Sequence, residues 1–184
     1  MDDEKLLIKQ CIDGHSNAQE LLYRRFASKM LGVCMRYANS RMEAEDILQE
    51  GFIKIFNNLD KFQFNGSLEG WVRRIMVNSA LTHYKANIKY IQSIEYDSAC
   101  CEEVSKSEIL ESINTKELLK LIQTMPEGYK MVFNMFAIEG YSHKEIGELM
   151  GISESTSKSQ LSRARVYLQE KIKKLMAVSY ERTA

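Results

Sequence analysis

Apolar residues recur at helical spacing along most of this chain, and the pattern is clearest between residues 43 and 60. The apolar or small positions of this stretch follow the i, i+3, i+4, i+7 template: Ala44, Ile47, Leu48, Gly51, Phe52, Ile55, Phe56 and Leu59. Such spacing places these side chains along one face of a helix. Because that face must be buried, the stretch predicts a helix packed against others.

The rest of the chain favours the same class of structure. Its 184 residues include one proline and nine glycines, so residues that break helices are scarce. We expect two helices before residue 43, with Ser16 as a possible N-cap of the second. Ser67 can cap a fourth helix that carries Trp71 and Val72, and Pro126 can start a helix in the second half. The sequence therefore predicts an all-α protein.

Charge and hydropathy restrict the kinds of partner. Lys plus Arg and Asp plus Glu both number 25, so the formal net charge is zero and any nucleic-acid surface must be local. No apolar run is long enough to span a bilayer, and the acidic start at residues 1–5 is unlike the basic start of a signal peptide. We therefore expect a cytoplasmic protein.

The sequence contains no recognisable catalytic or metal-binding motif. Cys11, Cys34, Cys100 and Cys101 lack the spacings of zinc sites, and the three histidines are scattered. Neither a glycine-rich phosphate loop nor a nucleophile constellation occurs. We expect reduced thiols, no metal, no cofactor and no enzymatic activity.

The charges divide the chain into parts. Residues 93–115 contain six acidic residues and a single basic residue, Lys106, a composition typical of a solvated linker. This predicts two small helical domains, at 1–92 and 116–176, joined by a flexible acidic linker and followed by a tail at 177–184.

The stretch from residue 141 to 165 predicts a helix-turn-helix. Ser142 and Glu145 have the spacing of a capping box, and Gly151 can end the helix in the left-handed region. Ser153 can then cap a second helix that starts at about Glu154, while Gly147 permits close packing.

The second helix of this motif has the character of a DNA-reading helix. Its early residues are small, polar or basic, and from Ser155 to the end of the chain seven Lys or Arg residues face two acidic ones. A helix of this kind can enter the major groove and contact phosphates. Ser157 departs from the pattern, because this motif usually carries an aliphatic residue there. An ordinary helical hairpin is the alternative that these local features alone leave open.

Two sets of motifs resemble the extracytoplasmic-function (ECF) sigma factors, the compact two-domain members of the bacterial sigma family. Residues 125–130, 139–146 and 159–165 are similar to the family's region four. Residues 44–52 and 71–78 are similar to region two. The resemblance covers almost the whole chain and implies a subunit that gives RNA polymerase its promoter specificity and opens the promoter.

In such a protein the helix at 43–60 would dock on the clamp of the polymerase's largest subunit. Its exposed side should carry Asp46, Gln49, Glu50 and Ile53. Acidic residues there would give orientation and on-rate against basic partner residues. A merely solvated face is the alternative explanation of these charges.

The resemblance assigns the minus-ten promoter element to the loop at 61–67 and to the helix that follows. The segment from Gly70 to Ile94 lacks acidic residues and interleaves basic and aromatic side chains, a combination suited to single-stranded DNA. The loop would capture an extruded base. The candidates are Lys61, Phe64, Asn65, Ser67, Trp71, Arg73, Arg74, Asn78, Tyr84 and Lys85. For Trp71 a core position is the alternative.

The second helix of the helix-turn-helix would read the duplex minus-thirty-five element. The candidates for base and phosphate contacts are Ser155, Thr156, Lys158, Ser159, Gln160, Arg163 and Arg165. Gln160 stands where arginine is common in the family, and glutamine can pair with adenine where arginine favours guanine.

The resemblance also implies partners. These are core RNA polymerase, through the clamp and through the flap of the second-largest subunit, promoter DNA, and an anti-sigma factor. The acidic linker would run through the polymerase, where its charge can mimic a nucleic-acid strand or simply aid solubility. Redox control through Cys100 and Cys101 is a further hypothesis.

Two other functions are compatible with the C-terminal motif. A conventional helix-turn-helix regulator would bind duplex DNA by itself, with residues 1–92 sensing a signal or forming a dimer. A recombinase would need a catalytic cluster that the sequence does not show. An acid-rich exposed helix beside an acid-free aromatic stretch favours polymerase docking and strand opening.

Overall fold

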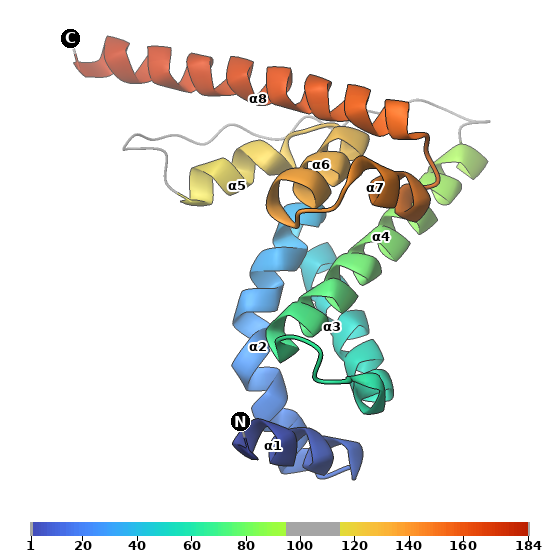
Figure 1. Cartoon of the computed structure of the whole chain (residues 1–184). Coiled ribbons are helices and arrows are strands. Elements are labelled where there is room, and N and C mark those ends of the chain that lie inside the picture. The colour runs from blue at the N-terminus through green and yellow to red at the C-terminus, as the bar shows by residue number, and fades with distance from the viewer. Residues whose placement is uncertain (1, 95–114, 184) are drawn as a thin grey trace. The chain divides into compact units, whose positions relative to one another are not determined.

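The computed structural model describes residues 2–94 and 115–183, and all regular structure in these two ranges is helical (Figure 1). The chain divides into two compact units, Met1–His83 and Tyr84–Ala184, with the boundary inside helix α4. The all-α class predicted from the sequence is confirmed. No helix in the described part of the chain is long and apolar enough to cross a membrane.

The first unit is built from four helices and one short 3-10 turn. In chain order these are α1 (Asp2–Ile12), α2 (Ser16–Tyr37), α3 (Arg41–Asn58), the 3-10 turn η1 (Leu59–Lys61) and α4 (Leu68–Ile94), of which the first part belongs to this unit. Helix α2 packs against α1 and α3, and α1 also contacts η1.

The apolar stripe predicted at 43–60 forms the buried face of α3. Ala44, Ile47, Gly51 and Ile55 are buried there, and Leu59 continues the core in η1. A Cβ at Gly51 would meet the thioether of Met76 on α4, so the missing side chain lets the two helices approach closely. The helix begins at Arg41 and ends at Asn58, two residues before each predicted limit.

Two cysteines lie inside the first unit. Cys11 and Cys34 are both buried and unpaired with each other. Burial raises the pKa of the Cys11 thiol, and it raises the pKa of the Cys34 thiol to about 12. Both thiols therefore stay protonated at neutral pH.

The second unit contains the helix-turn-helix. Besides the end of α4, it contains α5 (Thr115–Gln123), α6 (Glu127–Phe133), a π-helical turn η2 (Asn134–Ile138), α7 (His143–Met150) and the 30-residue α8 (Glu154–Thr183). Leu121, Ile122 and Met125 pack against Ala164 and Leu168 of α8. The long α8 thus supplies both the second helix of the motif and one wall of the core.

The observed N-termini of the helices agree with some of the predicted capping residues and differ from others. Ser67 caps α4, because its Oγ accepts a hydrogen bond from the Gly70 N–H at 3.1 Å. Ser16 does not act as an N-cap: it is the first residue of α2, and the cap position is His15, whose side chain makes no capping bond. Pro126 immediately precedes α6 and occupies its cap position instead of its first turn.

The predicted linker at 93–115 overlaps the described residues only at 93, 94 and 115, which lie in α4 and α5. Its acidic residues, together with Cys100 and Cys101, lie outside the described residues.

Candidate nucleic-acid and partner surfaces

The outer face of α3 is held in place by capping at the helix start and by the buried stripe on the opposite side. The Ser40 Oγ accepts a hydrogen bond from the Glu43 N–H at 3.1 Å, and the Glu43 carboxylate accepts one from the Asn39 N–H at 2.6 Å. On α4, His83 Nδ1 lies 3.2 Å from the Glu43 carboxylate. These contacts fix the start of α3 against α4.

The four predicted polymerase-docking residues are brought together on this face. Asp46, Gln49 and Glu50 are exposed, and Ile53 is 61% exposed. Met42 precedes Asp46 by four residues and is 73% exposed. We call Met42, Asp46, Gln49, Glu50 and Ile53 the α3 outer face. Met42 was missed in the sequence, although its position one turn before Asp46 places it on the same side of a helix.

Two exposed aliphatic side chains flanking two carboxylates make the α3 outer face suitable for binding a protein. Large apolar side chains gain by leaving water, and the carboxylates between them can pair with basic groups. The neighbouring Glu45 is already paired with Arg41 at 2.8 Å and is not part of this face.

The loop between η1 and α4 has an unusual backbone. Phe64 has a φ of 57°, the only positive φ at a residue other than glycine in the described ranges, and Gly66 has a φ of 143°. A bulky aromatic residue in the left-handed region is strained and persists only where its surroundings hold it there.

Aromatic rings surround this loop. Phe62 is buried, and its ring centroid lies 4.8 Å from that of Phe64 and 5.5 Å from that of Trp71. Phe64 is 45% exposed and Trp71 is half-buried. Trp71 therefore takes part in the core of the first unit and also reaches its surface, so the two interpretations of this residue do not exclude each other.

The predicted minus-ten residues divide into two groups. On α4, Trp71, Arg74 and Asn78 share one face, with Arg74 and Asn78 exposed. Arg73 is half-buried, and its charge adds to the hydrogen bond from Lys29 that lowers the pKa of the nearby Glu69 carboxyl. In the loop, Asn65 and Ser67 are exposed, and exposed Lys61 donates a hydrogen bond to the Asn58 side chain at 2.7 Å. Past the unit boundary, Tyr84 is half-buried and Lys85 is exposed.

The helix-turn-helix has the local geometry that its sequence predicts. Ser142 and Glu145 form a complete capping box, and Gly151 ends α7 with a φ of 73° and a ψ of 32°. The Ser153 Oγ accepts a hydrogen bond from the Thr156 N–H at 3.0 Å and so caps α8. A Cβ at Gly147 would lie 2.8 Å from the Ile152 carbonyl oxygen, so only glycine fits under this turn.

The first turns of α8 present a polar surface. Ser155, Ser159 and Arg163 are exposed, and exposed Lys158 pairs with Glu154 at 2.6 Å. The hydrogen bond from Lys158 lowers the pKa of the Glu154 carboxyl. Arg165 is exposed, with its guanidinium 6.0 Å from the ring centroid of Phe136.

Two of the predicted minus-thirty-five residues, Gln160 and Thr156, are half-buried within the second unit. Gln160 is half-buried against α6, where a Cβ at Gly128 would lie 3.2 Å from its Nε2, and its Oε1 is buried without a hydrogen-bond partner. Thr156 is half-buried, and its Oγ1 lies 2.7 Å from the Ser153 Oγ in the cap. The structure therefore does not place them on the open face with Ser155, Ser159 and Arg163.

The unusual Ser157 has a partner inside the motif. Its side chain is fully buried, and its Oγ is hydrogen-bonded to His143 Nδ1 at 2.9 Å. The His143 ring stacks on Phe136, with centroids 4.4 Å apart. The serine is thus compatible with burial because a histidine 14 residues earlier satisfies it. Sequence inspection missed this pair, whose signal was a polar residue at a core position of a helix.

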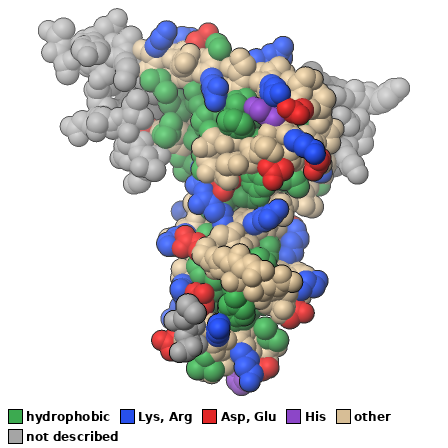
Figure 2. Space-filling view, in the orientation of Figure 1, with side chains coloured by type: hydrophobic (Ala, Val, Ile, Leu, Met, Phe, Trp, Pro, Cys, Tyr) green, Lys and Arg blue, Asp and Glu red, His purple; other side chains and the backbone are tan. Residues whose placement is uncertain are grey.

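On the face that Figure 2 draws, the basic side chains of the described residues are not gathered in one patch. Lys and Arg side chains on that face are spread over both units and alternate with acidic ones (Figure 2). This agrees with the zero net charge and indicates local surfaces instead of one large basic field. Among the described residues, no group of three or more His, Cys, Asp or Glu side chains could hold a metal ion.

Comparisons with known proteins match both units. Residues 22–89 match the family model of sigma-70 region 2, and residues 115–168 match that of sigma-70 region 4. The chain is 27% identical to the ECF RNA polymerase sigma-E factor of Haemophilus influenzae, with 94% of this chain and 97% of that protein covered. The sigma-E factor of Escherichia coli K12 is also 27% identical, with 94% and 96% covered.

A solved structure has a similar fold. The sigma factor RpoE from Bartonella quintana, crystallised in complex with the anti-sigma factor NepR, aligns with a TM-score of 0.55 and 18% identity. The alignment covers 84% of this chain and 96% of that one. Both sigma-70 regions are thus present in order, and the relatives are matched almost from end to end. The chain belongs to the ECF group of the sigma-70 family of RNA polymerase sigma factors.

Proposed function

We propose that this protein binds core RNA polymerase and directs promoter-specific initiation by reading the minus-ten and minus-thirty-five elements and helping to open the strands. One observation carries the proposal. A single chain combines an exposed partner face on α3, a strained aromatic loop before α4 and a polar α8 surface behind a helix-turn-helix. A sigma factor needs all three, and it needs no catalytic chemistry of its own.

Docking on the polymerase is assigned to the α3 outer face. Asp46 and Glu50 are one helical turn apart and would meet basic groups of the clamp, which guides encounter and sets orientation. Met42 and Ile53 lie at the two ends of the face and would supply apolar contacts that hold the complex.

Recognition of the minus-ten element is assigned to the loop and to the face of α4 that carries Arg74 and Asn78. Phe64 is an exposed ring on which an unpaired base can stack, with Trp71 close behind Phe62. Asn78 can hydrogen-bond a base edge, and Arg74 can contact a phosphate. Capture of an unpaired base would offset part of the cost of opening the duplex.

Recognition of the minus-thirty-five element is assigned to the open surface of α8. Ser155, Ser159 and Arg163 are the exposed candidates, together with Lys158 if it leaves Glu154 for a phosphate. The inward position of Gln160 makes it a support for α6 in this proposal and not a reader of adenine.

Regulation by an anti-sigma factor is part of the proposal. RpoE of Bartonella quintana, which has a similar fold, was crystallised with such a partner. A protein that covers the α3 outer face would exclude core polymerase from it by direct competition.

Run-off transcription with core RNA polymerase of the source bacterium tests this function. The protein should yield transcripts from specific promoters, and the double variant Asp46→Arg/Glu50→Arg should abolish them. Asp13→Arg is the control for added positive charge, because Asp13 is exposed in the turn after α1 and is not part of the α3 outer face. Binding of duplex DNA by the free protein, without any stimulation of core polymerase, would instead favour the helix-turn-helix regulator.

A further inference from the structure

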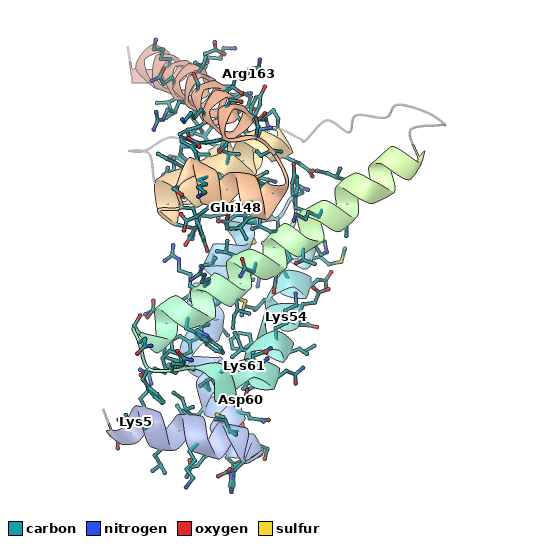
Figure 3. All side chains as sticks on the ribbon, turned by 45° about the vertical axis from the view of Figure 1, so that its right-hand side comes forward. Lys5, Lys54, Asp60, Lys61, Glu148 and Arg163 are labelled. Atoms are coloured by element: carbon teal, nitrogen blue, oxygen red, sulfur yellow. The ribbon has the colours of Figure 1, made fainter. Side chains whose placement is uncertain are left out.

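Lys5 in the first helix lies beside the strained loop. Its Nζ is 5.6 Å from the ring centroid of Phe64, above the ring, in a cation–π arrangement. In Figure 3 the part of α1 that carries Lys5 lies next to the loop that leads into α4. No motif of the sequence had indicated a role for this residue.

The position of Lys5 is fixed by the packing of α1. Leu7 and Ile8 are buried on the inner side of this helix, and α1 contacts both α2 and η1. Glu4, the residue before Lys5, pairs with Arg25 of α2 at 3.1 Å. The start of α1 is therefore anchored to α2, and the ammonium group is brought to the ring by the fold and not by a free tail.

Phe64 needs such support because its conformation is unfavourable by itself. Its φ of 57° is strained for an aromatic residue, and almost half of the side chain faces water. The other described contact of the ring is with Phe62. An exposed ring in a strained backbone conformation points to a ligand that stacks on it, and the ring must keep one orientation to receive that ligand.

We propose that Lys5 is a positioning residue that holds the Phe64 ring ready to stack on an unpaired base of the minus-ten element. The inference rests on the proposed function, which it extends to α1. The ammonium acts through the ring and does not itself need to contact DNA. A cation–π contact at an exposed site corresponds to about a two- to five-fold change in an equilibrium constant.

Binding of a fluorescent single-stranded oligonucleotide by the reconstituted holoenzyme tests this role. The oligonucleotide carries the nontemplate minus-ten sequence of a promoter transcribed in the run-off experiment, and affinity is measured over a range of salt concentrations. Lys5→Met keeps the aliphatic stem and the helix but removes the charge, and it should weaken binding about two- to five-fold. Lys9→Met is the matched control on the same helix, where no ring contact is described, and should bind like the wild type.

A double-variant cycle separates positioning from direct contact. In a Phe64→Leu background the Lys5→Met change should cost nothing further, because no aromatic ring remains to be held. The salt dependence of binding should be the same with and without Lys5. An equal loss in both backgrounds, with a log–log salt slope reduced by about 0.7, would mean a phosphate contact and would overturn the proposal.

The outcomes also separate this inference from the function on which it rests. Wild-type holoenzyme that fails to bind the oligonucleotide contradicts the minus-ten assignment, and the role of Lys5 falls with it. Wild-type binding that Lys5→Met leaves unchanged overturns only the role of Lys5. Equal thermal unfolding of Lys5→Met and wild type excludes loss of folding as the cause of weaker binding.

Discussion

Gly147 shows how a single missing methyl group sets the geometry of the DNA-binding motif. The Ile152 carbonyl oxygen occupies the space that a side chain would need, at 2.8 Å from a Cβ placed there. Helix propensity favours alanine over glycine by about 1 kcal/mol, but this gain is smaller than the cost of forcing backbone atoms apart.

We therefore expect Gly147→Ala to destabilise the second unit by about 1–3 kcal/mol. Native-state hydrogen exchange measures the effect, because it reports the two units separately. Gly32→Ala is the control: a Cβ at Gly32, inside α2, meets nothing within 4 Å, so this change should stabilise the first unit by about 0.5–1 kcal/mol. Greater stability of Gly147→Ala would contradict the steric argument.

The buried Ser157 gives a second prediction at a single residue. Ser157→Ala removes the partner of His143 Nδ1, and we expect a loss of about 1 kcal/mol in the stability of the second unit. His143→Ala should cost less in the Ser157→Ala background than in the wild type, since the shared hydrogen bond is already absent. Hydrogen exchange of α7 and α8 amides measures both steps. Additive effects of the two substitutions would show that the pair is not coupled.

At the scale of elements, an ion pair connects α2 with α4. Lys29 donates a hydrogen bond to Glu69 at 2.8 Å, and this bond lowers the pKa of the Glu69 carboxyl. A lowered pKa in the folded state means that the ionised form stabilises folding. That contribution is present above the ordinary pKa near 4.5 and is lost as the pH falls through the lowered value.

Glu69→Gln should therefore reduce the acid dependence of the first unit's stability by the contribution of Glu69, while the other carboxylates of the unit continue to titrate. Unfolding measured between about pH 3 and pH 7 tests this expectation. Lys29→Met should likewise reduce the loss of stability at acid pH, because it removes the hydrogen bond that is the largest cause of the lowered Glu69 pKa. A wild-type acid limb retained in both variants would contradict the assignment.

The capping residues of the helix-turn-helix were predicted correctly from the sequence, whereas Ser16 is not an N-cap and both ends of α3 lie two residues before their predicted limits. The capping box at Ser142 and Glu145, the left-handed Gly151 and the cap at Ser153 are local interactions within four residues, so their signals are local as well. The buried stripe of α3 was predictable for the same reason, because its period follows from helix geometry.

Features that depend on distant contacts could not be predicted in this way. The positive φ of Phe64 accompanies contacts with Phe62 and with Lys5, which is 59 positions earlier in the chain. The inward position of Gln160 depends on Gly128 in α6, and the π-helical turn at Asn134–Ile138 has no signature in its residues. The helix faces of the candidate site were therefore predicted from the sequence. For the aromatic loop the sequence predicted only its place in the chain, and neither its backbone conformation nor its ring contacts.

At the scale of the whole molecule, two units with separate cores carry separate proposed tasks. A change on the side of α8 that is proposed to face DNA should affect duplex recognition while leaving the proposed docking through α3 intact. Such independence is useful, because polymerase binding and promoter choice can then be altered one at a time.

Arg163→Gln tests this separation. Because Arg163 is exposed and proposed to contact a phosphate, we expect weaker binding of holoenzyme to duplex promoter DNA and a salt slope reduced by about 1. Affinity for core polymerase should not change. Lys9→Gln, in the first unit, is the control for loss of one positive charge. Reduced core binding by Arg163→Gln would contradict the division of tasks.

The buried thiols of the first unit can report how often its core opens by local unfolding. A protonated thiol that water rarely reaches, such as that of Cys34, reacts with an alkylating reagent only during the moments when the helices around it separate. The rate of alkylation, measured by peptide mass spectrometry, therefore reflects how often the helices separate. A partner that binds the first unit and stabilises its folded state would lower the rate of alkylation, even if the partner contacts neither cysteine.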